Sequence, residues 1–183
     1  MKNKVTHTIR IIWYAFLLII AAFVLGTICY IHLLLPTPEY KVSTYPKLSA
    51  ALSKNPELVI PAEDSLPSEP TYLTVYVPRR LRSSPKAGYR IDMDIGSVNL
   101  YVDCRTLDSY TGSGQEIPEF LANQCFGQMP VEVLDSKTTM SITFHTDTCQ
   151  YSIIANGRNS ILAQEVKDIT VELAQSLISQ ILS

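Results

Sequence analysis

Residues 89–103 read YRIDMDIGSVNLYVD, and their pattern predicts the local structure most clearly. Apolar and polar side chains alternate on both sides of the central Gly96-Ser97, which is the period of two expected of a half-buried β-strand. The Gly-Ser pair in the middle is typical of a tight turn. The stretch therefore predicts an antiparallel hairpin with strands over residues 89–95 and 97–103.

Further strands are predicted on both sides of this hairpin. Residues 71–78, TYLTVYVP, form a β-branched and aromatic run that a proline stops. Residues 105–130 lose the alternation and contain three Gly and two Pro, so we expect a long loop there with a helical turn over residues 119–124. Three more runs of strand-forming residues lie over residues 131–134, 139–146 and 150–155.

The C-terminal residues change to a helical period. Only one basic residue lies among the polar positions of this segment, which is unlike a helix lying in a membrane interface. The fold class predicted is α+β, with a single N-terminal transmembrane helix followed by a small, mostly antiparallel sheet and a C-terminal amphipathic helix packed on it. The apolar stripe of that last helix consists of Val166, Ile169, Leu173, Leu177 and Ile181.

The N-terminal part of the chain has the composition of a membrane span. Residues 11–35 read IIWYAFLLIIAAFVLGTICYIHLLL and contain no formal charge. At about 1.5 Å per residue, a helix of this length exceeds the roughly 30 Å of a hydrocarbon core. Basic residues precede the run, so the positive-inside rule predicts a single-pass protein of the plasma (inner) membrane, in contact with the lipid bilayer, with an extracytoplasmic C-terminal domain. These basic residues are Lys2, Lys4 and Arg10.

Two other interpretations of this segment stay open. A cleaved signal peptide shares the basic start, but its apolar region is normally about 7 to 15 residues long. Lipoprotein processing at Cys29 requires a small residue where Ile28 stands. Within the segment, Ala22 and Gly26 form a small-xxx-small pair, which would allow two such helices to pack closely in lipid.

Residues 36–70 contain seven prolines, which lack amide donors and fix φ. We expect an extended or irregular stalk there, with about two turns of helix over residues 47–54. The predicted organisation has four parts: a cytoplasmic tail over residues 1–10, a transmembrane helix over 11–35, a proline-rich linker over 36–70 and an extracytoplasmic α+β domain over 71–183.

Three cysteines follow the predicted membrane segment, and one disulfide can form among them in an oxidising compartment. A bridge between Cys104 and Cys125 is favoured because it closes the irregular loop, for which the chain-entropy model gives roughly 3 kcal/mol. Cys125 with Cys149, or three reduced thiols, are the alternatives. No zinc spacing occurs, and the acidic stretch 92–103 departs from a calcium loop at its fifth and sixth positions. No metal and no cofactor are predicted.

Two further groups of side chains are candidates for function. His145 and Asp147 would share one face of a strand, which can orient an imidazole toward a serine, but the sequence has no Gly-x-Ser-x-Gly elbow. No catalytic set is therefore assigned. The densest basic cluster lies between two predicted strands, where it would contact an acidic partner or remain solvated. This cluster consists of Arg79, Arg80, Arg82 and Lys86.

Charge and composition narrow the class of function. The chain has 183 residues and a formal charge of -2, but residues 1–10 carry +3, so the remainder has 12 basic and 17 acidic residues. An acidic remainder disfavours nucleic acid as a partner. The function predicted is a membrane-anchored extracytoplasmic binding or interaction module, an accessory or sensory component of a cell-envelope assembly with a protein partner. The alternatives are an envelope hydrolase using His145, or a membrane-complex subunit acting through its transmembrane helix.

Overall fold

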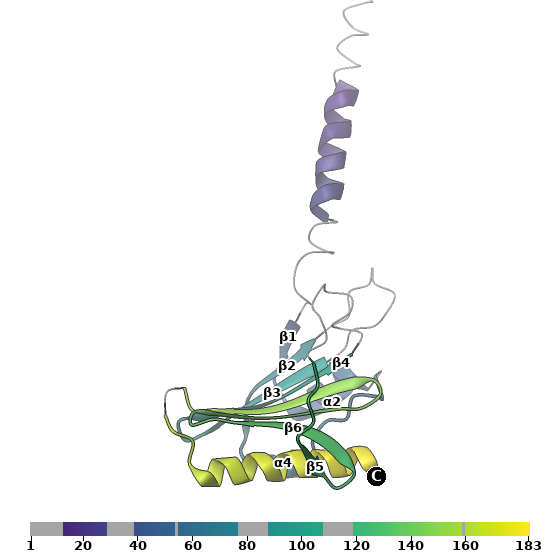
Figure 1. The fold of residues 1–183 in the computed structure, drawn as a ribbon. Coiled ribbons are helices and arrows are strands. Elements are labelled where there is room, and N and C mark those ends of the chain that lie inside the picture. Colours follow the sequence, from purple (N-terminus) through teal and green to yellow (C-terminus); the bar gives the residue numbers. More distant parts are fainter. Residues whose placement is uncertain (1–12, 29–38, 54, 77–87, 108–118, 159) are drawn as a thin grey trace, which may run out of the picture. The chain divides into compact units, whose positions relative to one another are not determined.

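The computed structural model describes residues 13–28, 39–53, 55–76, 88–107, 119–158 and 160–183. They fall in two compact units, residues 1–36 and residues 37–183, and each unit is described by itself. In the first unit, residues 13–28 are helical and their side chains are exposed. The second unit contains the strands and the remaining helices (Figure 1).

The helix of residues 13–28 does not agree with the predicted membrane span. Within the described part of the chain, no helix combines the length and the apolar character needed to cross a bilayer. The transmembrane helix expected over residues 11–35 is therefore unsupported. The predicted location, a single-pass protein of the plasma (inner) membrane, is wrong.

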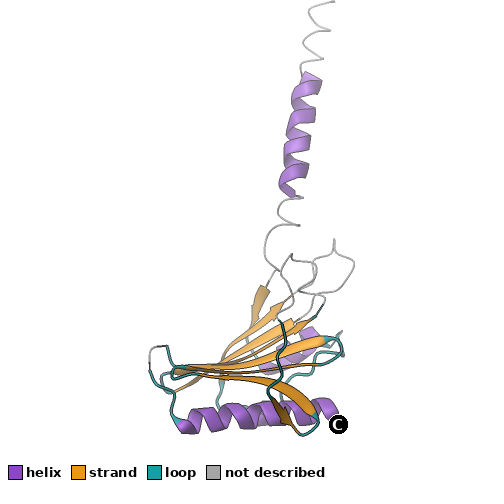
Figure 2. Cartoon of the chain, viewed as in Figure 1, coloured by secondary structure: helices purple, strands orange, loops and turns teal. Residues whose placement is uncertain are grey.

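In the described residues of the second unit, an eight-stranded antiparallel sheet lies together with two α-helices and a short 3-10 helix (Figure 2). The α+β class is confirmed. The strands lie in the order β1-β2-β3-β4-β8-β7-β6-β5. They are β1 (Glu39–Val42), β2 (Pro70–Tyr76), β3 (Gly88–Ile95), β4 (Val98–Thr106), β5 (Gln124–Phe126), β6 (Met129–Asp135), β7 (Thr139–His145) and β8 (Cys149–Asn156). The helices are α2 (Tyr45–Leu52), η1 (Glu63–Ser65) and α4 (Gln164–Leu182).

The hairpin predicted from residues 89–103 is β3 and β4. Ile91 lies opposite Val102, and Met93 lies opposite Leu100, so the apolar positions of both strands share one face. Gly96 in the turn has a φ of 60°, which glycine adopts without strain. The period of two and the turn residues therefore placed this hairpin correctly.

The last strand, β8, lies beside β4 and not at an edge of the sheet. Val102 of β4 pairs with Ile153 of β8, so the chain returns to the middle of the sheet after it has built β5, β6 and β7. The expected loop over residues 105–130 includes the end of β4 and all of β5. The helical turn expected over residues 119–124 does not form.

The side chain of Asn123 pairs with β6 just beyond the end of β5. The Asn123 amide donates to the Val133 carbonyl oxygen at 2.8 Å, and its own oxygen accepts from the Val133 amide at 2.9 Å. This side chain thus occupies backbone groups of β6 that β5 does not reach. The backbone groups of Val133 are thus paired where β6 extends beyond β5.

One face of the sheet, called the inner face here, packs against α4. Leu173, Ala174 and Leu177 of α4 are buried, in the same core cluster as Ile142 of β7 and Ile153 of β8. Figure 1 shows α4 running along this side of the sheet. The predicted packing of the C-terminal helix on the sheet is therefore what the structure has.

The proline-rich segment expected as a stalk is, from residue 39 onward, part of the same unit. β1 pairs with β2, and α2 buries Leu48 and Leu52 in the core. Residues 55–62, which we call the strap, continue across the inner face and bury Leu58. Proline prevents a regular hydrogen-bond ladder but does not prevent apolar side chains from packing, which is why composition alone suggested a free stalk.

Tyrosine hydroxyls hold the strap in place. Tyr89 of β3 donates to the Val59 carbonyl oxygen at 2.6 Å, and Tyr151 of β8 accepts from the Val59 amide at 3.0 Å. Tyr45 of α2 donates to the carbonyl oxygen of Pro61. These bonds satisfy backbone groups that no strand pairs, so an irregular segment can be partly buried without a large desolvation penalty.

Candidate functional site

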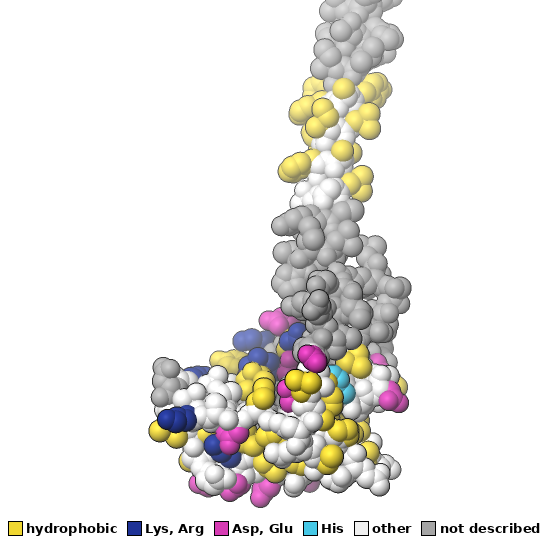
Figure 3. Space-filling view, in the orientation of Figure 1, with side chains coloured by type: hydrophobic (Ala, Val, Ile, Leu, Met, Phe, Trp, Pro, Cys, Tyr) yellow, Lys and Arg dark blue, Asp and Glu magenta, His cyan; other side chains and the backbone are white. Residues whose placement is uncertain are grey.

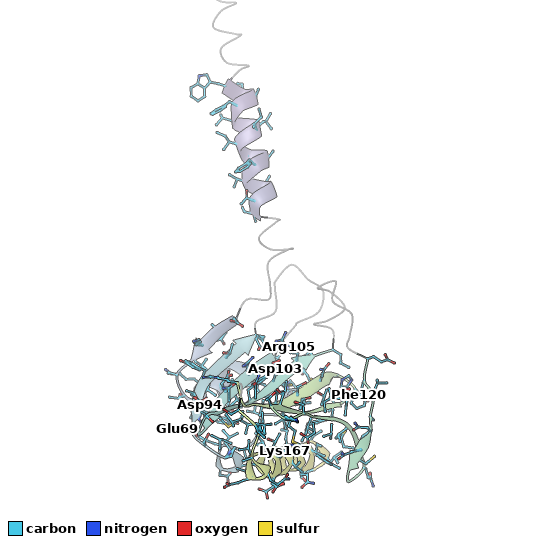
Figure 4. The ribbon with its side chains drawn as sticks, turned by 60° about the vertical axis from the view of Figure 1, so that its left-hand side comes forward. Glu69, Asp94, Asp103, Arg105, Phe120 and Lys167 are labelled. Atoms are coloured by element: carbon cyan, nitrogen blue, oxygen red, sulfur yellow. The ribbon has the colours of Figure 1, made fainter. Side chains whose placement is uncertain are left out.

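The face of the sheet away from α4, called the outer face here, carries polar and aromatic side chains. Strand residues alternate between the two faces, so the neighbours of the buried Ile91, Val102 and Cys104 all point outward. In Figure 4, Asp103 and Arg105 lie on the opposite side of the sheet from Lys167, which belongs to α4. Within the described part of the second unit, α2 and α4 pack on the inner face, which makes the outer face the candidate functional surface.

Arg90, Asp92 and Tyr101 form the first of two similar groups on the outer face. Arg90 and Asp92 are two residues apart on β3, and their side chains form an ion pair at 2.6 Å. The guanidinium carbon of Arg90 also lies 3.9 Å from the centre of the Tyr101 ring on β4. The hydrogen bond that Arg90 donates to Asp92 raises the pKa of Arg90, so the guanidinium stays charged. The edge of the Arg90 guanidinium thus binds a carboxylate, and the flat face of the same group stacks on an aromatic ring.

Arg105, Asp103 and Tyr76 form the second group. Arg105 pairs with Asp103 at 3.1 Å, donates to the Tyr76 hydroxyl at 3.3 Å, and lies 4.5 Å from the centre of the Tyr76 ring. Burial raises the pKa of Asp103, and Arg105 and the Tyr76 hydroxyl oppose that rise. Burial also raises the pKa of Tyr76 to about 12, so its hydroxyl remains a hydrogen-bond donor at neutral pH.

Gly88 makes room for the second group. It lies opposite Tyr76 in β2 and opposite Arg105 in β4. A Cβ at this position would meet the Cys104 carbonyl oxygen and stand 2.9 Å from the Tyr76 ring. The ring can therefore cover the strand and reach Arg105 only because residue 88 has no side chain.

We call the two groups together the Tyr–Arg face. Lys41 of β1 extends it, because its ammonium lies 4.2 Å from the centre of the Tyr72 ring. Both acidic and basic side chains lie on the side of the domain that Figure 3 shows. The face consists of Tyr76, Arg90, Asp92, Tyr101, Asp103 and Arg105.

His145, the residue assigned to the alternative hydrolase, lies on the outer face at the end of β7. Its ring stacks on Phe120, with the ring centres 4.5 Å apart. Burial lowers the pKa of His145, while Glu132 opposes the change. Thr143 and Ser152 share this face but contact each other, at 3.2 Å. Among the described residues, no serine or threonine hydroxyl bonds the imidazole, so the structure assembles no nucleophile there.

The cysteines of the predicted disulfide are not brought together. Cys104 is buried on β4 and Cys125 is exposed on β5, and three strands lie between β4 and β5 in the sheet. Cys149 begins β8, next to β4, and is buried. Residues 104, 125 and 149 are all free thiols in this structure.

The remaining predicted sites contribute no residues to the Tyr–Arg face. The basic cluster of Arg79, Arg80, Arg82 and Lys86 lies outside the described residues. Ala22 and Gly26 are exposed on the helix of residues 13–28, in the first unit. Within the ranges that the structure describes, no three Cys, His, Asp or Glu side chains are grouped as metal ligands.

Sequence reasoning missed the Tyr–Arg face, although part of its signal was present. Arg90-x-Asp92 and Asp103-x-Arg105 each place opposite charges two residues apart, on one face of a strand. The contact of Arg105 with Tyr76 joins positions 29 residues apart, and pairing of β2 with β3 is needed to reveal it.

Comparison with models of known protein families, with curated proteins and with solved structures gives no match. The function is therefore inferred from the arrangement of the side chains.

Proposed function

We propose that this chain is a protein-binding module whose partner docks on the Tyr–Arg face. The observation that carries the proposal is the pair of arginines, each stacked on a tyrosine ring and each bonded to an aspartate on the same face. Tyrosine and arginine are enriched at the energetic centres of protein interfaces.

The two groups are also held in position before any partner arrives. Arg90 and Arg105 have side chains that are 35% and 40% exposed, although each already makes an ion pair and a ring contact. Fixing a long side chain at an interface costs about 0.5 to 1.5 kcal/mol when it is free. Side chains that are already ordered avoid part of this cost, so the face suits tight binding of a matching surface.

Charge favours a protein over a polyanion as the partner. Arg90 and Arg105 are each neutralised by an aspartate, and Asp94 adds a further negative charge to the same face of β3. A nucleic acid or another polyanion binds where phosphates meet unpaired cations. A partner that offers carbonyl oxygens and apolar groups fits tyrosine rings, hydroxyls and partly neutralised guanidinium groups better.

Position-resolved photo-crosslinking in the cells that make the protein tests this proposal. A benzophenone amino acid replaces Tyr101 on the Tyr–Arg face or Tyr72 beside it, and in a matched control it replaces Gln175 on the solvent side of α4. We expect one partner to be captured from positions 101 and 72 and not from 175. The proposal would be contradicted if position 175 captured the same protein at equal yield. It would also be contradicted if positions 101 and 72 captured no protein.

A further inference from the structure

The core contains a pair of neighbouring thiols that the Tyr–Arg face does not involve. Cys104 lies opposite Tyr151 in the β4–β8 pairing, and Thr106 lies opposite Cys149. Cys104 and Cys149 are therefore diagonal neighbours on the inner face, in two adjacent strands. Neither residue exposes any surface to solvent.

Cys149 also contacts the strap. Its thiol donates to the carbonyl oxygen of Glu57 at 3.6 Å. A side-chain hydrogen bond with Cys104 lowers the pKa of Cys149 to about 7, against the effect of burial, while burial raises the pKa of Cys104. Cys149 is thus the better nucleophile of the two, because the thiolate is the reacting form.

The side-chain hydroxyl of Thr106, next to these thiols, is buried and makes no hydrogen bond to the described residues. Thr106 is 6% exposed, and its Oγ1 has no hydrogen-bond partner among the described residues. Buried polar atoms without partners are uncommon in folded proteins. Because Thr106 is opposite Cys149, its hydroxyl can donate to an oxygen placed on that sulfur.

We propose that Cys104 and Cys149 are a redox pair, which a peroxide converts into a disulfide that cross-links β4 to β8. The Cys149 thiolate attacks one peroxide oxygen and breaks the O–O bond, giving a sulfenic acid and, with one proton, water. The Cys104 thiol then attacks the Cys149 sulfur and releases a second water as the S–S bond forms. Overall, two thiols and one hydrogen peroxide give one disulfide and two waters.

The position of Cys149 in the chain allows the approach that a disulfide needs. An S–S bond requires Cβ atoms roughly 3.5 to 4.5 Å apart, which is closer than diagonal positions in a regular sheet. Cys149 is the first residue of β8 and directly follows the turn at residues 146–148. The end of a strand beside a turn can shift toward β4 without disturbing the pairs further along, such as Val102 with Ile153.

The strap controls access to the pair. The Glu57 carbonyl oxygen accepts from Cys149 of β8, and the Val59 amide donates to Tyr151 of β8. Leu58, between them, is buried in the core. A peroxide molecule reaches Cys149 only when this segment opens locally. Cys125, in contrast, is exposed on β5.

The test uses the full chain with Cys29→Ser and Cys125→Ser, so that only Cys104 and Cys149 remain. The protein is purified reduced and treated with one equivalent of hydrogen peroxide under native conditions. We expect the intact mass to fall by two hydrogen atoms, both thiols to disappear when counted in denaturant, and a digest to contain the 104–149 linked peptides. A dithiol reductant should restore both thiols. With Cys149→Ser added as a control, the remaining thiol should form no internal link.

Three results would overturn the proposal. These are two thiols that persist under the same treatment, a gain of oxygen atoms without loss of hydrogen, and a disulfide found only between two copies of the chain. The role of the strap is tested separately with Leu58→Ala, which should speed oxidation several-fold. Leu173→Ala, which removes a buried leucine of α4, should speed it much less. Equal acceleration by both would mean that global unfolding, and not opening of the strap, exposes the pair.

Discussion

The guanidinium carbon of Arg90 lies 3.9 Å from the centre of the Tyr101 ring, on the sheet face that α4 leaves uncovered. Both residues belong to the hairpin of β3 and β4, yet they are diagonal and not directly opposite: Arg90 pairs in register with Asp103, and Tyr101 pairs with Asp92. The stacking therefore links two successive cross-strand pairs on the outer face, Arg90–Asp103 and Asp92–Tyr101. Together with the Arg105–Tyr76 contact, it gives the outer face an ordered aromatic and cationic surface.

A double-mutant cycle measures this contact. Denaturant unfolding of Arg90→Ala, Tyr101→Ala and the double variant should give a coupling free energy of about 0.5 to 1 kcal/mol, because the cation over the ring is partly exposed. Tyr101→Ala combined with Gln175→Ala, a distant position on α4, should be additive within about 0.5 kcal/mol. Equal, near-zero coupling in both cycles would show that Arg90 and Tyr101 do not interact in solution.

Truncation tests whether the strap belongs to the domain. A fragment that starts at Glu39 keeps β1, α2 and the strap, and we expect it to unfold cooperatively. A fragment that starts at Ser68 loses Leu48, Leu52 and Leu58 from the core. Each buried leucine contributes about 2 to 5 kcal/mol, against a total stability of roughly 5 to 15 kcal/mol. Thermal unfolding of the shorter fragment should therefore be broad or absent. Equally cooperative melting of both fragments would show that the residues before Ser68 are a stalk outside the folded core.

The helix α4 provides a matched pair of substitutions two residues apart. Leu173 is buried and Gln175 is exposed on the same helix. Leu173→Ala should lower the free energy of unfolding by about 2 to 5 kcal/mol, and Gln175→Ala should change it by no more than about 0.5 kcal/mol. Chemical denaturation of the two variants and the parent provides the measurement. Identical midpoints for both variants would mean that α4 does not pack on the sheet in solution.

The pKa of His145 predicts a dependence of stability on pH. Burial lowers this pKa below the usual value of 6.5, so in the window between the two values the unfolded chain binds more protons than the folded one. Stability should therefore fall as pH drops below about 6.5, and the loss should end once pH is below the folded pKa. His145→Gln should lose less stability than the parent between neutral and mildly acidic pH. An unchanged pH profile in that variant would place the titration on another group.

Periodicity predicted the parts of the fold that are local in sequence. The alternation over residues 89–103 predicted β3 and β4, and the stripe through Leu173 and Leu177 predicted α4 and its buried face. The position of β8 beside β4 was not predictable in this way, because alternation identifies a strand but does not say which strand it joins.

The errors arose where composition was used in place of packing. Seven prolines in residues 36–70 indicated a stalk, but hydroxyls of Tyr89 and Tyr151, far along the chain, satisfy the strap's backbone. The uncharged run over residues 11–35 indicated a membrane span, which the described helix over 13–28 does not support. The thiol pair of Cys104 and Cys149 was missed because loop length, and not strand order, guided the choice of disulfide.

Binding of a protein partner to the Tyr–Arg face is tested by the affinity of matched variants for the partner captured by crosslinking. Isothermal titration with the full chain should show that Tyr101→Ala and Arg90→Ala each weaken binding by about tenfold or more, equivalent to about 1.4 kcal/mol. Gln175→Ala should bind within about twofold of the parent. Unchanged affinity in both face variants, with the parent's fold retained, would contradict the account.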